Sequence, residues 1–158
     1  EKSAIAELAV VQRKTQVVMK YETQWLNSTK VMIVRADFIA KAGFNLNRDF
    51  RFTVKRPERK VLVELPKPGI LDVALQNYEI VFSSDGIINK LQPADQEAVV
   101  NQLLAKARQD AARSDMAQEA QQQIEQRLRD LLHDMDATIT VRFLDPPPPP
   151  PGKPGPAA

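Results

Sequence analysis

The hydrophobic pattern of this chain changes its period at Pro93. From Leu8 to Phe82, apolar and polar residues alternate, which is typical of β-strands with one buried face. After Pro93 the apolar residues recur every three to four positions, as in an amphipathic helix. The pattern alternates again from Thr138 to Leu144. This order predicts an α+β fold, in which an antiparallel sheet of about five or six strands is covered on one face by two helices and completed by a C-terminal strand.

The clearest signal in the alternating part is a hairpin around the turn Arg56-Pro57-Glu58-Arg59. Proline fixes φ near −65°, which excludes a type I′ turn and favours a four-residue loop. The register that places Arg51 opposite Glu64, as a cross-strand salt bridge, also gathers the apolar residues on one face. We expect that face to lie in the core, and it holds Phe50, Phe52, Val54, Val61, Val63 and Leu65.

Three further segments read as strands, at residues 8–21, 30–41 and 77–82, and the polar sequence TQWLNS separates the first two. Pro66 and Pro68 have no amide hydrogen to donate, so the segment around them is expected to end a strand at a sheet edge.

The helical block begins at Pro93, which suits the first position of a helix. One continuous helix to Met135 would be about 60 Å long, whereas a globule of this size is only about 40 Å across. The apolar positions also slip in phase near Ser114 and Asp115, two good N-cap residues, so we expect a break there. The two expected apolar stripes are Val100, Leu103, Leu104, Ala107 and Ala111, then Ala117, Ala120, Ile124, Leu128, Leu131 and Met135.

Proline also marks the end of the folded part. Eight of the twelve prolines lie in the last thirteen residues. We therefore predict one domain over residues 1–145 and a Pro-rich tail over 146–158. A run of prolines forms a stiff polyproline II rod, which a partner protein with an aromatic-lined groove can bind. An inert tail is the alternative. The candidate partner-binding residues are Pro146, Pro147, Pro148, Pro149, Pro150 and Pro151.

Composition excludes several functions. The chain has 158 residues and a formal net charge of only +2, which argues against a protein that coats nucleic acid. No cysteine and a single histidine exclude disulfides, thiolate metal sites, a thiol nucleophile and His-rich metal sites. Residues 1–92 hold fifteen Lys and Arg against ten Asp and Glu, while residues 93–136 hold five against nine. A basic sheet covered by acidic helices is the expected result.

No catalytic, cofactor or metal site can be assembled from the remaining polar residues, so we do not expect an enzyme. His133 lies near the end of the last helix, where the helix dipole favours a cation. Asp134 and Asp136 lack the further oxygen ligands that a calcium site needs. Ser83 and Ser84 lack the glycine pattern of a nucleophile turn, and no Gly-rich phosphate loop occurs.

The basic hairpin is the other candidate site. The predicted register places Lys55 directly opposite Lys60, and an anion would relieve this repulsion between like charges. One hypothesis is contact with phosphates of lipid headgroups or of nucleic acid. The other is a solvated tip whose cations discourage edge-to-edge association. The candidate anion-binding residues are Arg51, Lys55, Arg56, Arg59 and Lys60.

The order of motifs resembles a bacterial domain-of-unknown-function family, number 4230. A strand leads into Ala42-Gly43-Phe44-Asn45-Leu46, and the hairpin ends in Leu65-Pro66-Lys67-Pro68-Gly69-Ile70-Leu71. The family's elements at these places read "aGiDL" and "LPxPxIL", and the resemblance covers about residues 8–144. This chain departs from the family in having Phe-Asn where Ile-Asp is usual, and in its Pro-rich tail.

The resemblance implies a domain outside the cytoplasm, anchored to a membrane of the bacterial cell envelope, with no activity or ligand attached to the family. A chain that starts at Glu1 without methionine fits the loss of an N-terminal anchor. Our leading hypothesis is a non-catalytic, membrane-tethered domain that binds or scaffolds a protein partner. The alternative is an anion-binding module that contacts lipid headgroups or nucleic acid through residues 51–60. Nucleic acid is disfavoured by the net charge, and a homo-oligomer is left open.

Overall fold

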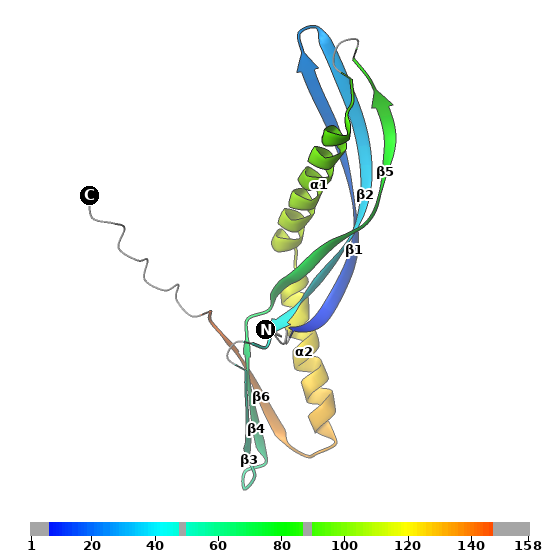
Figure 1. Ribbon diagram of the computed structural model, residues 1–158. Coiled ribbons are helices and arrows are strands. Elements are labelled where there is room, and N and C mark those ends of the chain that lie inside the picture. Colours follow the sequence, from blue (N-terminus) through cyan, green and yellow to red (C-terminus); the bar gives the residue numbers. More distant parts are fainter. Residues whose placement is uncertain (1–6, 48–49, 87–89, 147–158) are drawn as a thin grey trace, which may run out of the picture.

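The computed structural model describes residues 7–47, 50–86 and 90–146, and it confirms the α+β fold (Figure 1). The described chain forms six strands and two helices, arranged as two three-stranded sheets beside a pair of helices. The expected strands are thus divided between two sheets.

The first sheet is antiparallel, with the order β1-β2-β5. Its strands are long: β1 spans Glu7–Trp25, β2 spans Ser28–Asn45 and β5 spans Gly69–Ser84. The polar segment predicted to separate β1 from β2 is mostly strand, because pairing continues to Trp25 opposite Ser28. Only Leu26 and Asn27 form the turn, and Leu26 has a φ of 51°. The polar residues there belong to strand ends, which explains the difference from the prediction.

The second sheet has the order β3-β4-β6. Here β3 is Arg51–Lys55, β4 is Lys60–Pro66 and β6 is Thr138–Leu144, with β4 antiparallel to β3 and parallel to β6. Pro66 is the last residue of the central strand β4, not an edge residue, and an end position tolerates its missing amide. The chain passes from the second sheet to the first between Pro66 and Gly69.

One face of the first sheet carries the larger core. Alternate residues of β2 are buried against α1, which spans Pro93–Arg113 and begins with proline as predicted. Val99, not Val100, is the first buried apolar residue of this helix. The core includes Met32, Val34, Ala36, Phe38, Ala40, Val99, Leu103, Ala107, Ala111, Met116 and Ala120.

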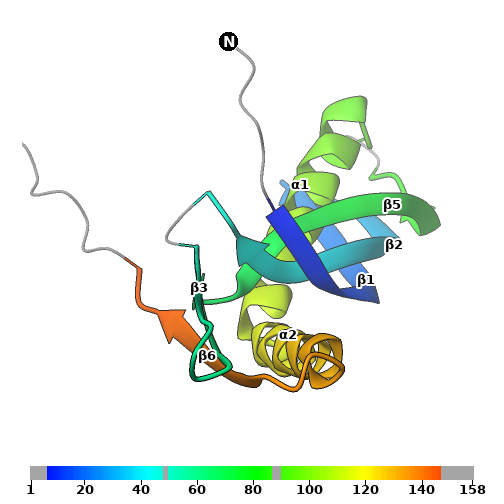
Figure 2. The same cartoon turned by 90° about the horizontal axis from the view of Figure 1, so that it is seen from below.

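The helical block breaks where the phase slip predicted. Ser114 ends α1, with its Oγ donating to the carbonyl of Ala111 at 2.6 Å, and α2 spans Met116–His133. The second helix contacts strands of both sheets, and in Figure 2 it lies below the first sheet and beside β6. The predicted stripe of α2 is wrong at its end, because Leu131 and Met135 are exposed while Leu132 is buried. The register of α2 is set by Met116, Ala120 and Ile124 at four-residue spacing, which turns Leu132 inward.

Ion pairs attach the helices to the first sheet, as the charge distribution predicted. Arg13 of β1 donates to Asp115 at 2.9 Å and to Glu119 at 2.8 Å. Hydrogen bonds from the guanidinium group lower the pKa of the Asp115 carboxyl, and the two acids raise the pKa of Arg13.

A buried cluster fixes the first turn of α1. The ammonium group of Lys30 on β2 lies 2.9 Å from the Asp95 carboxylate, and both side chains are only 10% exposed. The carboxylate also accepts hydrogen bonds from Tyr21 Oη at 3.1 Å and from the Gln92 amide at 2.6 Å. Burial raises the pKa of Asp95, but these hydrogen bonds, with that from Lys30 the strongest, lower it to below its ordinary value.

Gly43 allows a close approach of β1 to β2. It lies in β2, and a Cβ atom added to it would come 1.9 Å from the carbonyl oxygen of Leu8. The pairing of β1 with β2 shifts by one residue between Ala9 and Val11, next to this contact. Only glycine therefore allows the two backbones to approach so closely.

Candidate functional site

The basic hairpin of β3 and β4 has the predicted geometry (Figure 1). Arg51 pairs with Glu64 and Lys55 with Lys60, which confirms the register. Residues 56–59 form a four-residue turn, closed by a hydrogen bond from the Arg59 amide to the Arg56 carbonyl at 3.3 Å. All ten residues from 51 to 60 are exposed.

The five cations of the hairpin fall into two groups. Arg59 pairs with Asp136 at 2.8 Å, and Lys60 lies 3.7 Å from Glu58. Arg51, Lys55 and Arg56 form no ion pair with any residue that the structure describes. The predicted salt bridge of Arg51 with Glu64 is therefore wrong.

Glu64 pairs with a residue of β6 instead. Its carboxylate lies 3.6 Å from the guanidinium group of Arg142 on β6, and its side chain is only 17% exposed. The carboxylate of β4 therefore pairs with β6, and Arg51 and Lys55 of β3 are available to a partner.

The apolar residues of β3, and Phe50 directly before it, are exposed, which corrects the prediction that they belong to the core. Phe50 is 49% exposed, and Phe52 and Val54 are each 52% exposed. Their pairing partners Val61 and Val63 are buried. Residues directly opposite each other in an antiparallel pair point to the same face, so one face of this sheet is covered at β4 and uncovered at β3.

The reason for the uncovered strand is the position of α2. The smaller core joins Ile124 and Leu132 of α2 to Phe44 of β2 and to residues of β4 and β6, and it includes no residue of β3. Phe44 also stacks on Phe143, with ring centroids 6.0 Å apart. The cover therefore ends at β4, one strand short of the sheet edge.

No strand of the described chain pairs with the other edge of β3. That edge is a row of backbone donors and acceptors available for another strand. The exposed strand β3, with its apolar face at Phe52 and Val54 and its basic face at Arg51 and Lys55, is called the β3 site below. It is the candidate functional site of this molecule.

The Pro-rich tail leaves the domain at the opposite end of the same sheet. Since β6 runs parallel to β4, its last residue Leu144 lies beside Pro66, far from the hairpin turn. Lys67 holds this end, with its amide donating to the Leu144 carbonyl at 3.2 Å and its ammonium group paired with Asp145. Pro146 is exposed there, and Pro147, Pro148, Pro149, Pro150 and Pro151 lie outside the described residues.

The other polar residues that the sequence singled out have structural places. His133 is exposed in the last turn of α2, where a cation is favoured. Asp136 pairs with Arg59, and Ser83 and Ser84 end β5 without leading directly into a helix. Within residues 7–47, 50–86 and 90–146, no three His, Asp or Glu side chains gather as they would around a metal ion.

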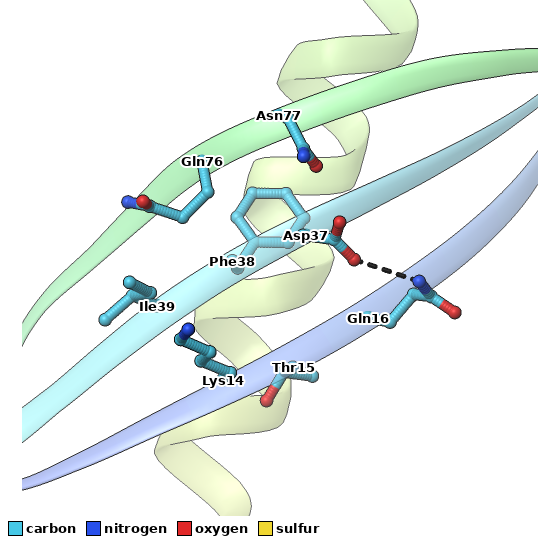
Figure 3. Close-up of a pocket in the computed structure, with 8 residues that line it drawn as sticks. All are labelled: Lys14, Thr15, Gln16, Asp37, Phe38, Ile39, Gln76 and Asn77. Carbon is cyan, nitrogen blue, oxygen red and sulfur yellow. Dashed lines mark hydrogen bonds between the residues drawn. The ribbon is translucent and has the colours of Figure 1, made fainter.

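A polar hollow that the sequence did not reveal lies on the face of the first sheet opposite the core (Figure 3). Its volume is about 430 Å³, and Gln16 donates to Asp37 across it at 2.9 Å. Every buried side-chain nitrogen or oxygen atom of the described chain has a hydrogen-bond partner, so this hollow holds no unsatisfied side chain that points to a ligand. Exposed polar positions of a long strand carry no signal that distinguishes such a hollow from any solvated face. It is lined by Lys14, Thr15, Gln16, Asp37, Phe38, Ile39, Gln76 and Asn77.

These features define an α+β domain in which a helix pair joins two sheets and an outer strand is left uncovered. The family model described as "Protein of unknown function (DUF4230)" matches residues 3–143, and the chain belongs to this family. The predicted resemblance is thereby confirmed. Searches of the curated proteins and of the solved structures found no match. In the part of the chain that the structure describes, no helix is long and apolar enough to cross a membrane.

Proposed function

We propose that this domain is a non-catalytic binding module that holds a protein partner at the β3 site. The observation that carries the proposal is the exposure of Phe52 and Val54 on a strand whose outer edge is unpaired. Uncovered apolar side chains beside an unpaired edge are the features that strand addition uses: backbone hydrogen bonds supply affinity and side chains supply specificity.

The test compares matched substitutions on two exposed strands. In Phe52→Thr/Val54→Thr the apolar face is lost, but threonine keeps the strand propensity. Val18→Thr on β1 is the control, because Val18 is 58% exposed and lies on the first sheet. The domain is used to capture proteins from cells of its native organism, and hydrogen exchange of the bound complex is then measured.

We expect one partner that the wild type and the control retain and the double variant loses. We also expect slower exchange of amides within residues 51–55 when that partner is bound, because strand addition protects the outer edge of β3. A partner retained equally by the double variant, or one that leaves exchange in β3 unchanged, would refute the proposal.

The family resemblance adds a location to this proposal: a tether to a membrane of the bacterial cell envelope. Fractionation of cells that express the whole protein tests it. Recovery with the membranes after a high-salt wash is expected, and recovery in the cytoplasmic fraction would contradict the tether.

The second candidate function is anion binding by the hairpin. Arg51, Lys55 and Arg56 have no acidic partner within the described residues, and Lys55 faces Lys60. Lipid headgroups or nucleic-acid phosphates would relieve that repulsion. This candidate predicts binding that is unchanged by Phe52→Thr/Val54→Thr and lost when the three unpaired cations are replaced.

A further inference from the structure

The β3 site has two faces of different chemistry. Because side chains alternate along a strand, Phe52 and Val54 point to one face, and Arg51, Thr53 and Lys55 point to the other. All five residues are exposed, so both faces are open to a partner. A strand added to this edge would place its own alternate residues beside these two sets.

A second copy of this chain does not fit the β3 site. In a symmetric antiparallel pair of two β3 strands centred on Thr53, Arg51 of one copy would face Lys55 of the other, and this would occur twice. Like charges directly opposite each other destabilise a strand pair. The neighbouring cations Arg56 and Lys60 add to the repulsion.

A nucleic-acid strand fits less well than a peptide. Single-stranded nucleic acid is held by bases stacked on aromatic rings together with cations that follow the backbone along the same groove. On β3 the Phe52 ring and the side chains of Arg51 and Lys55 lie on opposite faces. On the face of Phe52 the adjacent residues are Val54, Val61 and Val63, all apolar.

Among the other outer strands, β5 exposes apolar residues too, but its pairing is irregular. In β5, Tyr78, Val81 and Phe82 are exposed, yet the register with β2 shifts at three places along the strand. Bulges of this kind twist an edge and interrupt pairing with a new strand. The pairing of β3 with β4 has no such shift, so β3 is a more regular template than β5.

Resting on the proposed function, we infer that the partner segment of the β3 site is an extended strand with acidic side chains beside Arg51 and Lys55 and apolar side chains beside Phe52 and Val54. The pattern reads acidic, apolar, neutral polar, apolar, acidic. Because this pattern is the same in both directions, it holds for a parallel and for an antiparallel strand. The neutral position lies beside Thr53, where a hydroxyl or amide can form a cross-strand hydrogen bond.

The test uses three defined peptides with identical flanks and NMR titration of the whole chain. The core sequences are EVTVE, which carries the pattern, EEVVT, which has the same composition without alternation, and KVTVK, which reverses the charges. Backbone amide signals within residues 51–55 report binding at the β3 site even when affinity is low. The protein variants are Arg51→Glu/Lys55→Glu and, as a matched control on the first sheet, Lys14→Glu.

We expect EVTVE to shift the β3 amide signals with about tenfold higher affinity than either other peptide. KVTVK cannot form the two exposed ion pairs with Arg51 and Lys55, and EEVVT lacks the alternation that matches the two faces of β3. In Arg51→Glu/Lys55→Glu the preference should reverse toward KVTVK. The control Lys14→Glu should keep the wild-type order of the three peptides.

Each other outcome overturns the inference in a distinguishable way. Equal binding of EVTVE and KVTVK to the wild type would refute the acidic chemistry and leave strand binding at β3 intact. Failure of all three peptides, while a captured protein still protects the β3 amides, would refute the pattern but not the proposed function. Tighter binding of oligo-dT or of phosphatidylglycerol vesicles at the same amides would assign the cations to phosphates and refute the inference.

Discussion

Breaking the buried ion pair of Lys30 and Asp95 should lower the free energy of unfolding considerably, because this cluster attaches α1 to the first sheet. In Asp95→Asn the negative charge that pairs with the Lys30 ammonium group is lost. The Lys30 side chain, only 10% exposed, keeps neutral acceptors alone: the amide oxygen of the new residue and the Lys90 carbonyl at 3.5 Å. Removing one partner of a buried ion pair costs about 3–5 kcal/mol. We take the lower end, about 3 kcal/mol, because asparagine can still accept the Gln92 amide.

Lys30→Met should cost less, about 2 kcal/mol, because the carboxylate keeps its hydrogen bonds from Tyr21 and Gln92. The double variant buries no charge, and replacing a whole buried pair by neutral groups is often nearly neutral. We expect about 2 kcal/mol for it, where simple addition of the two single costs would give about 5 kcal/mol.

Urea unfolding of the four proteins measures this coupling, which should be about 3 kcal/mol. In thermal unfolding, the Tm of Asp95→Asn should be about 6–12 °C below that of the wild type, since 1 kcal/mol shifts Tm by about 2–4 °C for a chain of this size. The control is Glu22→Gln, which breaks the exposed pair of Lys20 and Glu22 and should cost below about 0.5 kcal/mol. Additive single costs, within about 0.5 kcal/mol, would refute the view that the two charges stabilise each other.

Three further predictions concern single positions. Gly43→Ala places its Cβ against a backbone carbonyl of β1 and should cost about 3 kcal/mol or detach the start of β1, whereas Gly69→Ala, with open space around it, should be nearly neutral by the same urea unfolding. Lys55→Glu turns repulsion from Lys60 into attraction and should stabilise the hairpin by about 0.5 kcal/mol in low salt, an effect that 1 M NaCl should remove. Folding lowers the pKa of Asp95, so its carboxylate contributes fully to the free energy of unfolding above the unfolded pKa of about 3.9, and this contribution is lost as the pH falls through the folded pKa. The difference in free energy of unfolding between wild type and Asp95→Asn should therefore shrink below about pH 4.

Local patterns predicted the elements of this fold well. The register of the hairpin followed from alternation, because a slip of one residue would turn every apolar side chain to the other face. The helix break at Ser114 followed from the phase of the apolar residues.

What the sequence could not predict depends on contacts between distant segments. The division into two sheets is set by β6, which pairs with β4 across more than seventy intervening residues. The exposure of Phe52 and Val54 depends on where α2 ends its cover, and no pattern within β3 reports that position. Because Phe52 and Val54 are exposed, they belong to the candidate site and not to the core that alternation predicted.

The two hypotheses for the basic hairpin, a protective tip and a binding site, are compatible once the exposed strand is taken into account. An outer strand with Phe52 and Val54 uncovered would pair readily with any other exposed edge, including that of a second copy. Arg51 and Lys55 lie on the opposite face of the same strand and repel another β3, so they limit self-association without covering the apolar face. The same two cations attract a strand that carries acids at those positions, because attraction to one partner and repulsion of others arise from one arrangement of charge. Reversing both charges should therefore have two results. Two copies still repel each other, because the two substituted positions then face each other with like negative charges, and light scattering should show no new self-association. Peptide titration should show that the preferred partner is exchanged.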